Sequence, residues 1–456
     1  GTKAVREAIG TLFGADGAFG YRHFILHHAR LAEEAGGVEA FLLGSEMQAL
    51  SRLRDETGAF PFVDELVALA GEVRAILGET TKISYAANWT EYGAYVPADG
   101  SGDVLFPLDV LWACEDIDFV GVDWYPPIGD WRDGNDHLDA LAGYDGPEDE
   151  AYLRSQLQGG EAYDWYYASE AARAQQVRSP IMDEAHGEAW VFRQKDILNW
   201  WSSAHHERPA GTRNAAPTGW SPGLKPVRLM ELGFPAVDLG TNAPNLFHDP
   251  KSAESAFPPF SSGVRNDVLQ RKALEVSLAY WSAQPCIEAV HAWAWDARPF
   301  PDFPARETIW SDGPNWALGH WLNGRSGLVS VGDVICDLAR QAGIEMEVVA
   351  LEGLVEGLVL SGPTSLRQVM EPLHALYRFR CLEREDGLLV TEQGAAPHPI
   401  IPVGQTGEDG VSITHVLLDK LPGRLELGYV DGAGAYGAAQ AEARAPEGDG
   451  SYTARA

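Results

Sequence analysis

Apolar positions follow two alternating patterns along the first 325 residues of the chain. Some stretches carry them at helical spacing, and short, almost continuously apolar runs separate these stretches, as in the strands of a buried parallel sheet. The first predicted helix stops at Gly36-Gly37, a pair that is typical of a helix end. In chain order the pattern predicts a helix at 21–35, a strand at 38–43, a helix at 63–77 and a strand at 82–87.

The same rhythm returns after a long interruption. Between residues 128 and 224 the chain is rich in Gly, Trp and Tyr, and its one clear helical pattern lies around 195–205. We interpret this stretch as a long excursion from the sheet. Further strands are predicted at 117–122, 226–230 and 287–295, and a further helix at 268–281.

Strands that alternate with helices predict an α/β fold, here a (β/α)8 TIM barrel. The pattern supplies about five strands, whereas a closed barrel needs eight, and residues 1–13 predict a helix instead. We therefore expect residues 1–325 to form the C-terminal portion of a barrel whose first strands lie upstream of Gly1.

The pattern changes after Arg325, where residues 326–456 predict a small α+β module with its own core. An Asp-Gly pair at 386–387 suits a tight turn and places a hairpin at 379–391. The Gly- and Ala-rich residues 432–456 predict a poorly ordered edge of a domain that continues beyond them. The other predicted elements of the module are helices at 329–343 and 365–377 and a strand at 354–360.

Charge excludes several classes of partner. The chain has 34 Lys and Arg against 66 Asp and Glu, a net charge of -32, which repels nucleic-acid phosphates and anionic lipid surfaces. We therefore expect no direct nucleic-acid binding. No apolar run approaches the roughly 20 residues that a membrane helix needs, so no membrane insertion is expected either.

The sequence predicts neither a cofactor nor a metal. The four cysteines are scattered without metal-ligand spacing and are expected to be free thiols. His205 and His206, together with Asp183, Glu184 and His186, offer one alternative metal site within the excursion. We favour the interpretation that they are ordinary polar residues of loops.

Two glutamates stand at the ends of predicted strands. Glu46 follows the strand that ends at Leu43, and Glu231 follows the strand at 226–230. The C-terminal rim of the strands is the catalytic face of a TIM barrel. Glycoside hydrolysis needs such a pair, one as acid and the other as nucleophile or base, about 5 Å apart in retaining enzymes. The alternative is that each glutamate pairs with an arginine or caps a helix.

Aromatic and polar side chains accompany every predicted strand end. Flat rings stack on sugar faces, so their repetition predicts a glycan site, although a single Trp more often belongs to a core. The Glu161–Tyr167 segment adds four aromatics, which either line an extended cleft or pack the excursion onto the barrel. The predicted substrate-binding residues are Ser45, Asn88, Trp89, Asp123, Trp124, Tyr125, Trp293, Trp295 and Asp296.

Several motifs together resemble a known family. They are residues 41–46 (FLLGSE), 225–233 (KPVRLMELG), 295–299 (WDARP) and 319–325 (GHWLNGR). They are similar to the glycoside-hydrolase TIM-barrel-like domain of gene transfer agent tail proteins, over residues 1–325. The segment that continues through 421–425 (LPGRL) resembles the phage-tail hub domain that follows in the same proteins.

The resemblance implies roles for the two glutamates. The wider glycosidase clan places its acid/base on strand four and its nucleophile on strand seven, which matches Glu46 and Glu231 in order. That clan usually has Asn before the acid/base, where it holds the sugar 2-hydroxyl. This chain has Ser45. A shorter hydroxyl predicts weaker transition-state stabilisation or a different substrate preference.

The resemblance also implies a biological setting. We expect a subunit of the tail-tip or baseplate hub of a phage-like particle, assembled in the cytoplasm with other tail proteins and copies of itself. Its glycosidase-like barrel would hydrolyse a bacterial envelope glycan, either peptidoglycan or surface polysaccharide, by a retaining two-glutamate mechanism. The alternative is a catalytically inactive barrel that binds glycan or spaces the hub.

Overall fold

The computed structural model describes most of the chain. It covers residues 1–14, 19–252, 255–324, 329–349, 351, 353–355, 357–358, 360, 362–384, 387–392, 422–431, 437–444 and 450–455. The predicted turn residues Glu385 and Asp386 and the motif residues Arg325 and Leu421 lie outside these ranges. The chain divides into two compact units, which are described separately: unit 1 is Gly1–Trp295 with Pro314–Trp321, and unit 2 is Asp296–Gly313 with Leu322–Ala456.

Unit 1 is built on a five-stranded parallel sheet whose strands follow one another in chain order. All five predicted strands are present, and the predicted α/β class is confirmed. Sequential parallel strands are the arrangement of a TIM barrel. The strands are β1 (Ala40–Ser45), β2 (Lys82–Asn88), β3 (Val120–Asp123), β6 (Val227–Leu232) and β7 (Ile287–Ala292).

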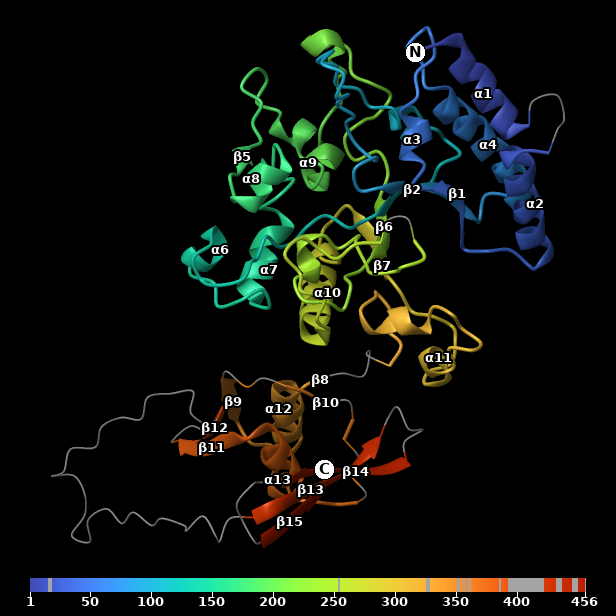
Figure 1. Cartoon of the computed structure of the whole chain (residues 1–456). Coiled ribbons are helices and arrows are strands. Elements are labelled where there is room, and N and C mark those ends of the chain that lie inside the picture. Colours follow the sequence, from blue (N-terminus) through green and yellow to red (C-terminus); the bar gives the residue numbers. More distant parts are fainter. Residues whose placement is uncertain are drawn as a thin grey trace. The chain divides into compact units, whose positions relative to one another are not determined.

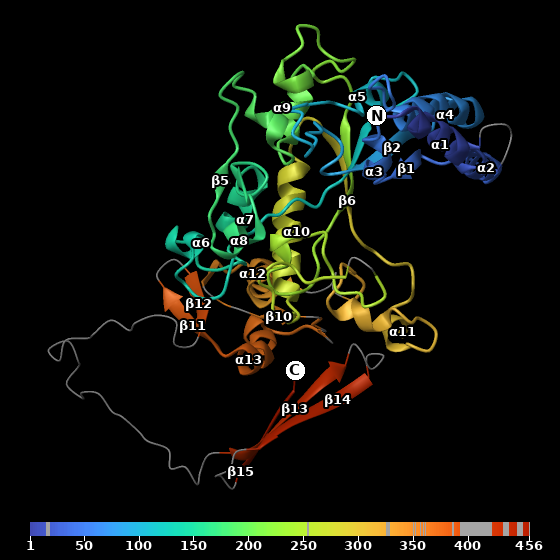
Figure 2. The same ribbon diagram turned by 45° about the horizontal axis from the view of Figure 1, so that its top comes forward.

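Amphipathic helices cover the sheet. The helix α4 buries an apolar face that includes Phe62, Leu66 and Val73, and Phe13 of α1 packs edge-on against Phe62 with ring centroids 5.7 Å apart. Figures 1 and 2 both show α1, α2 and α4 grouped at one side of the sheet. The bounds are α1 (Lys3–Phe13), α2 (Tyr21–Glu34), α3 (Gln48–Ser51), α4 (Pro61–Leu77), α5 (Asp109–Trp112) and α10 (Asp267–Trp281).

The excursion between β3 and β6 is more structured than the sequence predicted. It has several short helices where the pattern indicated one, because four to eight residues are too few to establish a helical period. Side-chain caps mark their starts, as at Asp149, Ser169 and Asp196. The elements are α6 (Leu138–Leu141), α7 (Glu150–Leu157), β4 (Trp165–Tyr166), α8 (Glu170–Ala174), β5 (Ser179–Pro180), α9 (Ile197–Ser202) and the 3-10 helices η2 (Ala189–Phe192) and η3 (Pro209–Gly211).

A buried lysine ties the excursion to the loop that follows β3. The Nζ of Lys195 donates to the carbonyls of Gly159 at 2.9 Å and Glu161 at 3.2 Å, and also to the carbonyl of Pro127. Buried backbone carbonyls need such donors. Figures 1 and 2 place the excursion, coloured teal to green, away from the blue helices at the other side of the sheet. The remaining short helices of the barrel region are η4 (Gly240–Asn242), η5 (Gly313–Ala317) and α11 (Asp302–Ala305).

Unit 2 contains the predicted α+β module. Its core joins Val331 and Ile335 of α12 to Leu373 of α13 and Val390 of β12. Ser330 and Ser365 cap the two helices. The elements are β8 (Val329–Ser330), α12 (Val331–Gln341), β9 (Met346–Val349), β10 (Leu354–Val355), α13 (Leu366–Tyr377), β11 (Phe379–Arg384), β12 (Gly387–Glu392), β13 (Pro422–Asp431), β14 (Gly437–Arg444) and β15 (Gly450–Arg455).

The predicted hairpin is present, since β11 and β12 pair antiparallel. Two predictions were wrong in detail. Of the described residues in the strand expected at 354–360, Leu354–Val355 form a strand, whereas Gly357, Leu358 and Leu360 do not. The segment expected to be poorly ordered contains β14 and β15, which both pair with β13. Small and charged residues hid these strands, because a strand outside a core needs no apolar alternation.

Candidate active site

Glu46 is held at the end of β1 in an unusual backbone conformation. It directly follows Ser45, the last residue of the strand, and its φ is 53°. Residues with a side chain rarely adopt this left-handed backbone conformation, and those that do often belong to functional sites. Its N–H donates to the carbonyl of Ala86 on the neighbouring strand at 2.8 Å. The exposed carboxylate accepts a 2.8 Å hydrogen bond from the side-chain amide of Asn88, the last residue of β2.

A buried glutamate, Glu91, stabilises the backbone turn at Glu46 and Met47 through Tyr85. The N–H of Met47 donates to the hydroxyl of Tyr85 at 2.6 Å, and that hydroxyl donates to Glu91 at 3.1 Å. Glu91 also accepts from the backbone N–H of Asn88 at 3.1 Å and from the Ser51 hydroxyl at 2.6 Å. The Glu91 carboxyl group therefore holds the backbone of Asn88 directly and that of Met47 through Tyr85.

Glu91 and Tyr85 were not among the residues predicted from the sequence. A signal was present, because Asn88 is followed by Thr90 and Glu91, a pattern typical of turns in which side chains bond the backbone. The Asn88 side-chain oxygen accepts from the Thr90 N–H at 2.9 Å. This turn directs the Asn88 amide nitrogen toward Glu46.

Glu231 lies inside β6, one residue before its end, and not beyond the strand as predicted. The two extra residues of the strand pair with its neighbours. The half-buried carboxylate accepts a 2.7 Å hydrogen bond from the hydroxyl of Tyr125. Burial raises the pKa of Glu231, the Tyr125 hydrogen bond lowers it, and the negative charge of Glu46 raises it further.

A third carboxyl group lies between the two glutamates. Asp123 ends β3, faces Glu231 in the strand register, and is 1% exposed. Burial raises its pKa to about 7, with a further contribution from Glu231, while a hydrogen bond from Ser45 opposes the rise. That hydrogen bond, from the Ser45 hydroxyl, is 2.7 Å long. The Ser45 hydroxyl is thus engaged by Asp123.

The carboxyl groups of Glu46, Asp123 and Glu231 therefore share one electrostatic environment at the C-terminal edge of the sheet. The charge of Glu46 raises the pKa of both other groups. Residues whose pKa is raised by burial together with a specific charged neighbour are typical of functional sites. The sequence placed all three at strand ends, and the register of β2, β3 and β6 brings those ends together.

The predicted aromatic residues divide between core and surface. Trp124 is 4% exposed and packs edge-on against Trp281, with ring centroids 5.1 Å apart. Its ring therefore belongs to the core of unit 1. Trp89 is half-buried and lines a pocket, and Trp293 and Trp295 are exposed by 46% and 65%.

Asp296, the last predicted contact, belongs to unit 2. The Asp296 carboxylate pairs with Arg298 at 2.5 Å. The backbone N–H of Asp296 donates to the side-chain oxygen of Asn323 at 2.6 Å. Arg298 also pairs with Asp312 at 2.7 Å. Within this unit, Asp296 orders the loop that contains the predicted motif 295–299.

Within the described residues, no group of three or more His, Cys, Asp or Glu is arranged to hold a metal ion. One histidine of the alternative metal site, His205, has other partners. His205 is buried, and its ring nitrogens bond to Asp109 and to the carbonyl of Trp200, each at 2.8 Å. Among the described helices, none has the length and apolar character needed to cross a membrane.

The family of the chain follows from a sequence comparison. Residues 19–304, more than half of the chain, match the GTA TIM-barrel-like domain. The chain belongs to this family. Residues 365–456 match a second family, described as "Putative phage tail protein". A GTA TIM-barrel-like domain followed by a phage tail domain is the order that the sequence motifs predicted, and the resemblance is confirmed.

Solved structures show a weaker similarity to this family member. A GH113 β-mannanase from Alicyclobacillus acidocaldarius is 15% identical, with 66% of this chain and 55% of that chain covered and a TM-score of 0.30. A protein of the native gene transfer agent (GTA) virion is 27% identical, with 32% and 35% covered and a TM-score of 0.29. The chain thus spans about half of the mannanase and about a third of the virion protein. With such low TM-scores, the fold is assigned from the family match and the strand order. A comparison with curated proteins finds no match.

Proposed function

We propose that unit 1 is a retaining glycoside hydrolase that cleaves a bacterial envelope glycan, and that the chain serves as a tail component of a gene transfer agent particle. The observation that carries the chemistry is the pair of strand-end glutamates. Each accepts a hydrogen bond from a neighbouring strand end, from Asn88 or from Tyr125, and their charges interact. The match to a phage tail family supports the setting.

In the proposed reaction Glu46 gives its proton to the glycosidic oxygen, while Glu231 attacks the anomeric carbon and forms a covalent ester. The Glu46 carboxylate then takes a proton from water, and the resulting hydroxide displaces Glu231 from the sugar. The Asn88 amide would orient Glu46. The Tyr125 hydroxyl favours the ionised form of Glu231 that the attack requires.

The assignment of the two roles rests on strand order. Electrostatics alone would make Glu231 the group that retains its proton, because burial and Glu46 raise its pKa. When Glu46 holds a proton taken from solvent, as the first step of the proposed reaction requires, its charge no longer raises the pKa of Glu231. An experiment that separates the roles is therefore essential.

The first test is loss of activity. Purified peptidoglycan and surface polysaccharide would be incubated with the wild-type chain, Glu46→Gln and Glu231→Gln, and new reducing ends counted. Each variant is expected to lose activity by roughly 10²-fold or more. Glu39→Gln is the matched control, because Glu39 is exposed at the opposite end of β1. Equal release by the wild type and both variants would contradict the proposal.

The second test assigns the roles. With an activated aryl glycoside, azide replaces the missing group in each variant. Glu231→Gln should give a glycosyl azide of inverted configuration, and Glu46→Gln one of retained configuration. The reverse outcome would exchange the two roles.

One observation favours a second candidate, an inactive barrel that binds glycan. The Ser45 hydroxyl, at the position where the related glycosidase clan carries Asn, is engaged by Asp123. Glycan binding without release of reducing ends by the wild type would identify this function instead.

A further inference from the structure

A pocket lies beside the candidate active site in unit 1. Its volume is about 640 Å³, within the range of ligand sites. One wall comes from Arg52 and from the loop after β2, including Trp89 and Tyr95, and the other comes from the excursion. Trp89 lines the pocket and directly follows Asn88, the residue that bonds Glu46, so the pocket begins one residue from a contact of the candidate catalytic pair.

Aromatic side chains occur in both walls of the pocket. Trp89, Tyr95, Tyr166, Tyr167 and Phe192 all contribute, and Tyr166 is 49% exposed. Rings with one free face offer flat apolar surfaces to the C–H faces of sugars. The Glu161–Tyr167 segment, for which the sequence left two interpretations open, supplies four of the lining residues, Glu161, Ala162, Tyr166 and Tyr167, and therefore forms part of a pocket wall.

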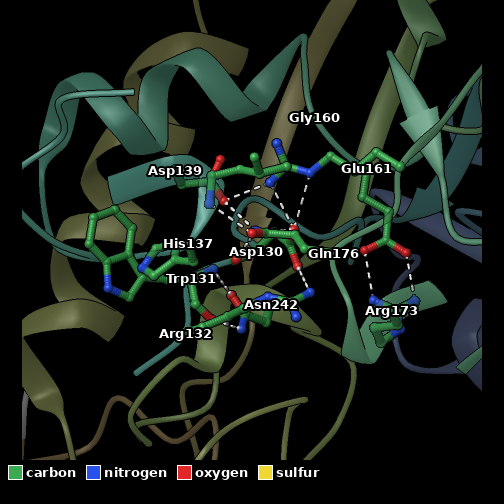
Figure 3. Close-up of polar contacts among 12 residues, drawn as sticks. Asp130, Trp131, Arg132, His137, Asp139, Gly160, Glu161, Arg173, Gln176 and Asn242 are labelled. Atoms are coloured by element: carbon green, nitrogen blue, oxygen red, sulfur yellow. Dashed lines mark hydrogen bonds and ion pairs between the residues drawn. The ribbon is translucent and has the colours of Figure 1, made fainter. Parts of the chain in front are cut away.

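The two charged residues that line the pocket, Glu161 and Arg52, differ in whether they form an ion pair. Glu161 is neutralised, because both carboxylate oxygens accept from Arg173, at 2.7 and 2.9 Å; Figure 3 shows the two groups facing each other. Arg52 forms no ion pair with a described residue. It lies over the Tyr95 ring at 4.9 Å and donates to the carbonyl of Thr90.

Glu91 is the carboxyl group whose charge reaches Arg52, but it is 4% exposed and already bonds Ser51, Tyr85 and the Asn88 backbone. Arg52 therefore keeps donor capacity for a ligand. A guanidinium group binds a carboxylate through two parallel hydrogen bonds.

The excursion wall is rigidly supported. The hydroxyl of Tyr167 donates to Asp130, and Arg173 stacks over its ring at 4.7 Å. Asp130 also accepts from Gln176 at 3.0 Å and from Arg178 at 2.8 Å. Figure 3 shows Asp130 among Arg132, Asp139 and Gln176. We call the network the Asp130 cluster and define it as Asp130, Arg132, Asp139, Tyr167, Gln176 and Arg178. Preorganised walls reduce the entropic cost of binding.

We propose that this pocket binds an acidic sugar residue of the glycan, with its carboxylate on Arg52 and its ring against the aromatic wall. A planar carboxylate with a single charge fits one guanidinium beside an aromatic wall. The inference rests on the proposed function for taking a glycan as the ligand. It adds that the substrate is a glycan that carries carboxylates.

Titration calorimetry on the full chain with the Glu231→Gln change tests the proposal without turnover. The acidic probes are N-acetylglucosaminyl-N-acetylmuramic acid and tetragalacturonic acid, which distinguish a muramic from a uronic carboxylate. Chitotetraose is the neutral probe. At least one acidic probe is expected to bind more tightly than chitotetraose, and Arg52→Gln should weaken it roughly tenfold or more.

Two further variants sharpen the result. Arg52→Lys keeps the charge but loses the two-pronged geometry, so it should bind between the wild type and Arg52→Gln. Arg54→Gln removes an equal charge two residues away, where Arg54 already pairs with Asp103 at 2.8 Å, and it should bind as the wild type does. Circular dichroism verifies that each variant is folded.

The proposal is overturned if no acidic probe binds, if chitotetraose binds as tightly, or if Arg52→Gln leaves the affinity unchanged. Its failure is distinguishable from failure of the proposed function. Hydrolysis by the wild type without Arg52-dependent binding removes only the acidic subsite. Arg52-dependent binding without any hydrolysis removes only the enzyme.

Discussion

Tyr125 controls the protonation of Glu231 through one hydrogen bond. Two effects raise the pKa of Glu231, and the hydroxyl of Tyr125 opposes them at 2.7 Å. A nucleophile must be ionised to attack. A residue that forms no bond to the sugar in the proposed reaction thus sets the pH range in which the reaction proceeds.

Tyr125→Phe should shift the pH dependence of hydrolysis. Without the hydroxyl the pKa of Glu231 rises further, so the acid limb of the kcat/KM profile is expected to move to higher pH. The rate of reducing-end release, measured between pH 4 and 9, checks this. Tyr280→Phe in α10 is a control that leaves the limb in place. An unchanged limb in Tyr125→Phe would mean that Glu231 is not the group whose ionisation limits the rate.

At the scale of elements, the excursion depends on the Asp130 cluster. Asp130→Asn removes the negative charge that Arg178, Arg132 and Tyr167 share. Breaking a buried charge network by removing one member costs about 3–5 kcal/mol. We expect a reduced free energy of unfolding for unit 1, measured in urea. Asp136→Asn, an exposed change in the same loop, is the control, and equal midpoints for the two variants would contradict the prediction.

The central strands of the sheet were predictable because they are buried on both faces. Runs such as that of β2, where five consecutive residues from Ile83 to Ala87 are buried, leave a continuous apolar signal. Glu46 and Glu231 were found because each stands where such a run ends. The same reasoning could not find Arg52 or Tyr95, whose roles depend on a pocket wall that comes from the excursion.

The helices of the excursion could not be predicted from the apolar pattern of the sequence. Its helices are held by caps and buried polar contacts instead of an apolar stripe, as with Lys195 and its three carbonyl partners. Trp124 shows the converse limit. A strand-end position predicts a rim residue, but packing against Trp281 decides that the ring is buried.

At the scale of the whole molecule, the two units can be followed separately. Every tryptophan except Trp310 belongs to unit 1, so tryptophan fluorescence reports the unfolding of the barrel unit. That unit also contains the buried carboxyl groups. Its stability is therefore expected to depend on pH in a way that fluorescence detects.

Asp123 provides the clearest case. Its pKa is about 7 in the fold against an ordinary 3.8, so the folded state binds its proton more tightly. The favourable contribution of Asp123 to the free energy of unfolding is complete at acid pH and is lost as pH rises from 4 to 7. It amounts to about 4 kcal/mol at most. Asp123→Asn cannot titrate and should flatten this decline. Urea midpoints at pH 4.5 and 8 check it, and an identical decline in the variant and in the wild type would refute it.

The backbone at Glu46 has a consequence for the history of the family. A φ of 53° costs a residue with a side chain about 1–2 kcal/mol, whereas glycine adopts it freely. A glutamate codon becomes a glycine codon by a single base change. In a lineage that no longer needs the carboxylate, both stability and mutational access favour glycine at this position. Under the proposed function, the residue that relatives carry there is a record of whether their barrels use the carboxylate.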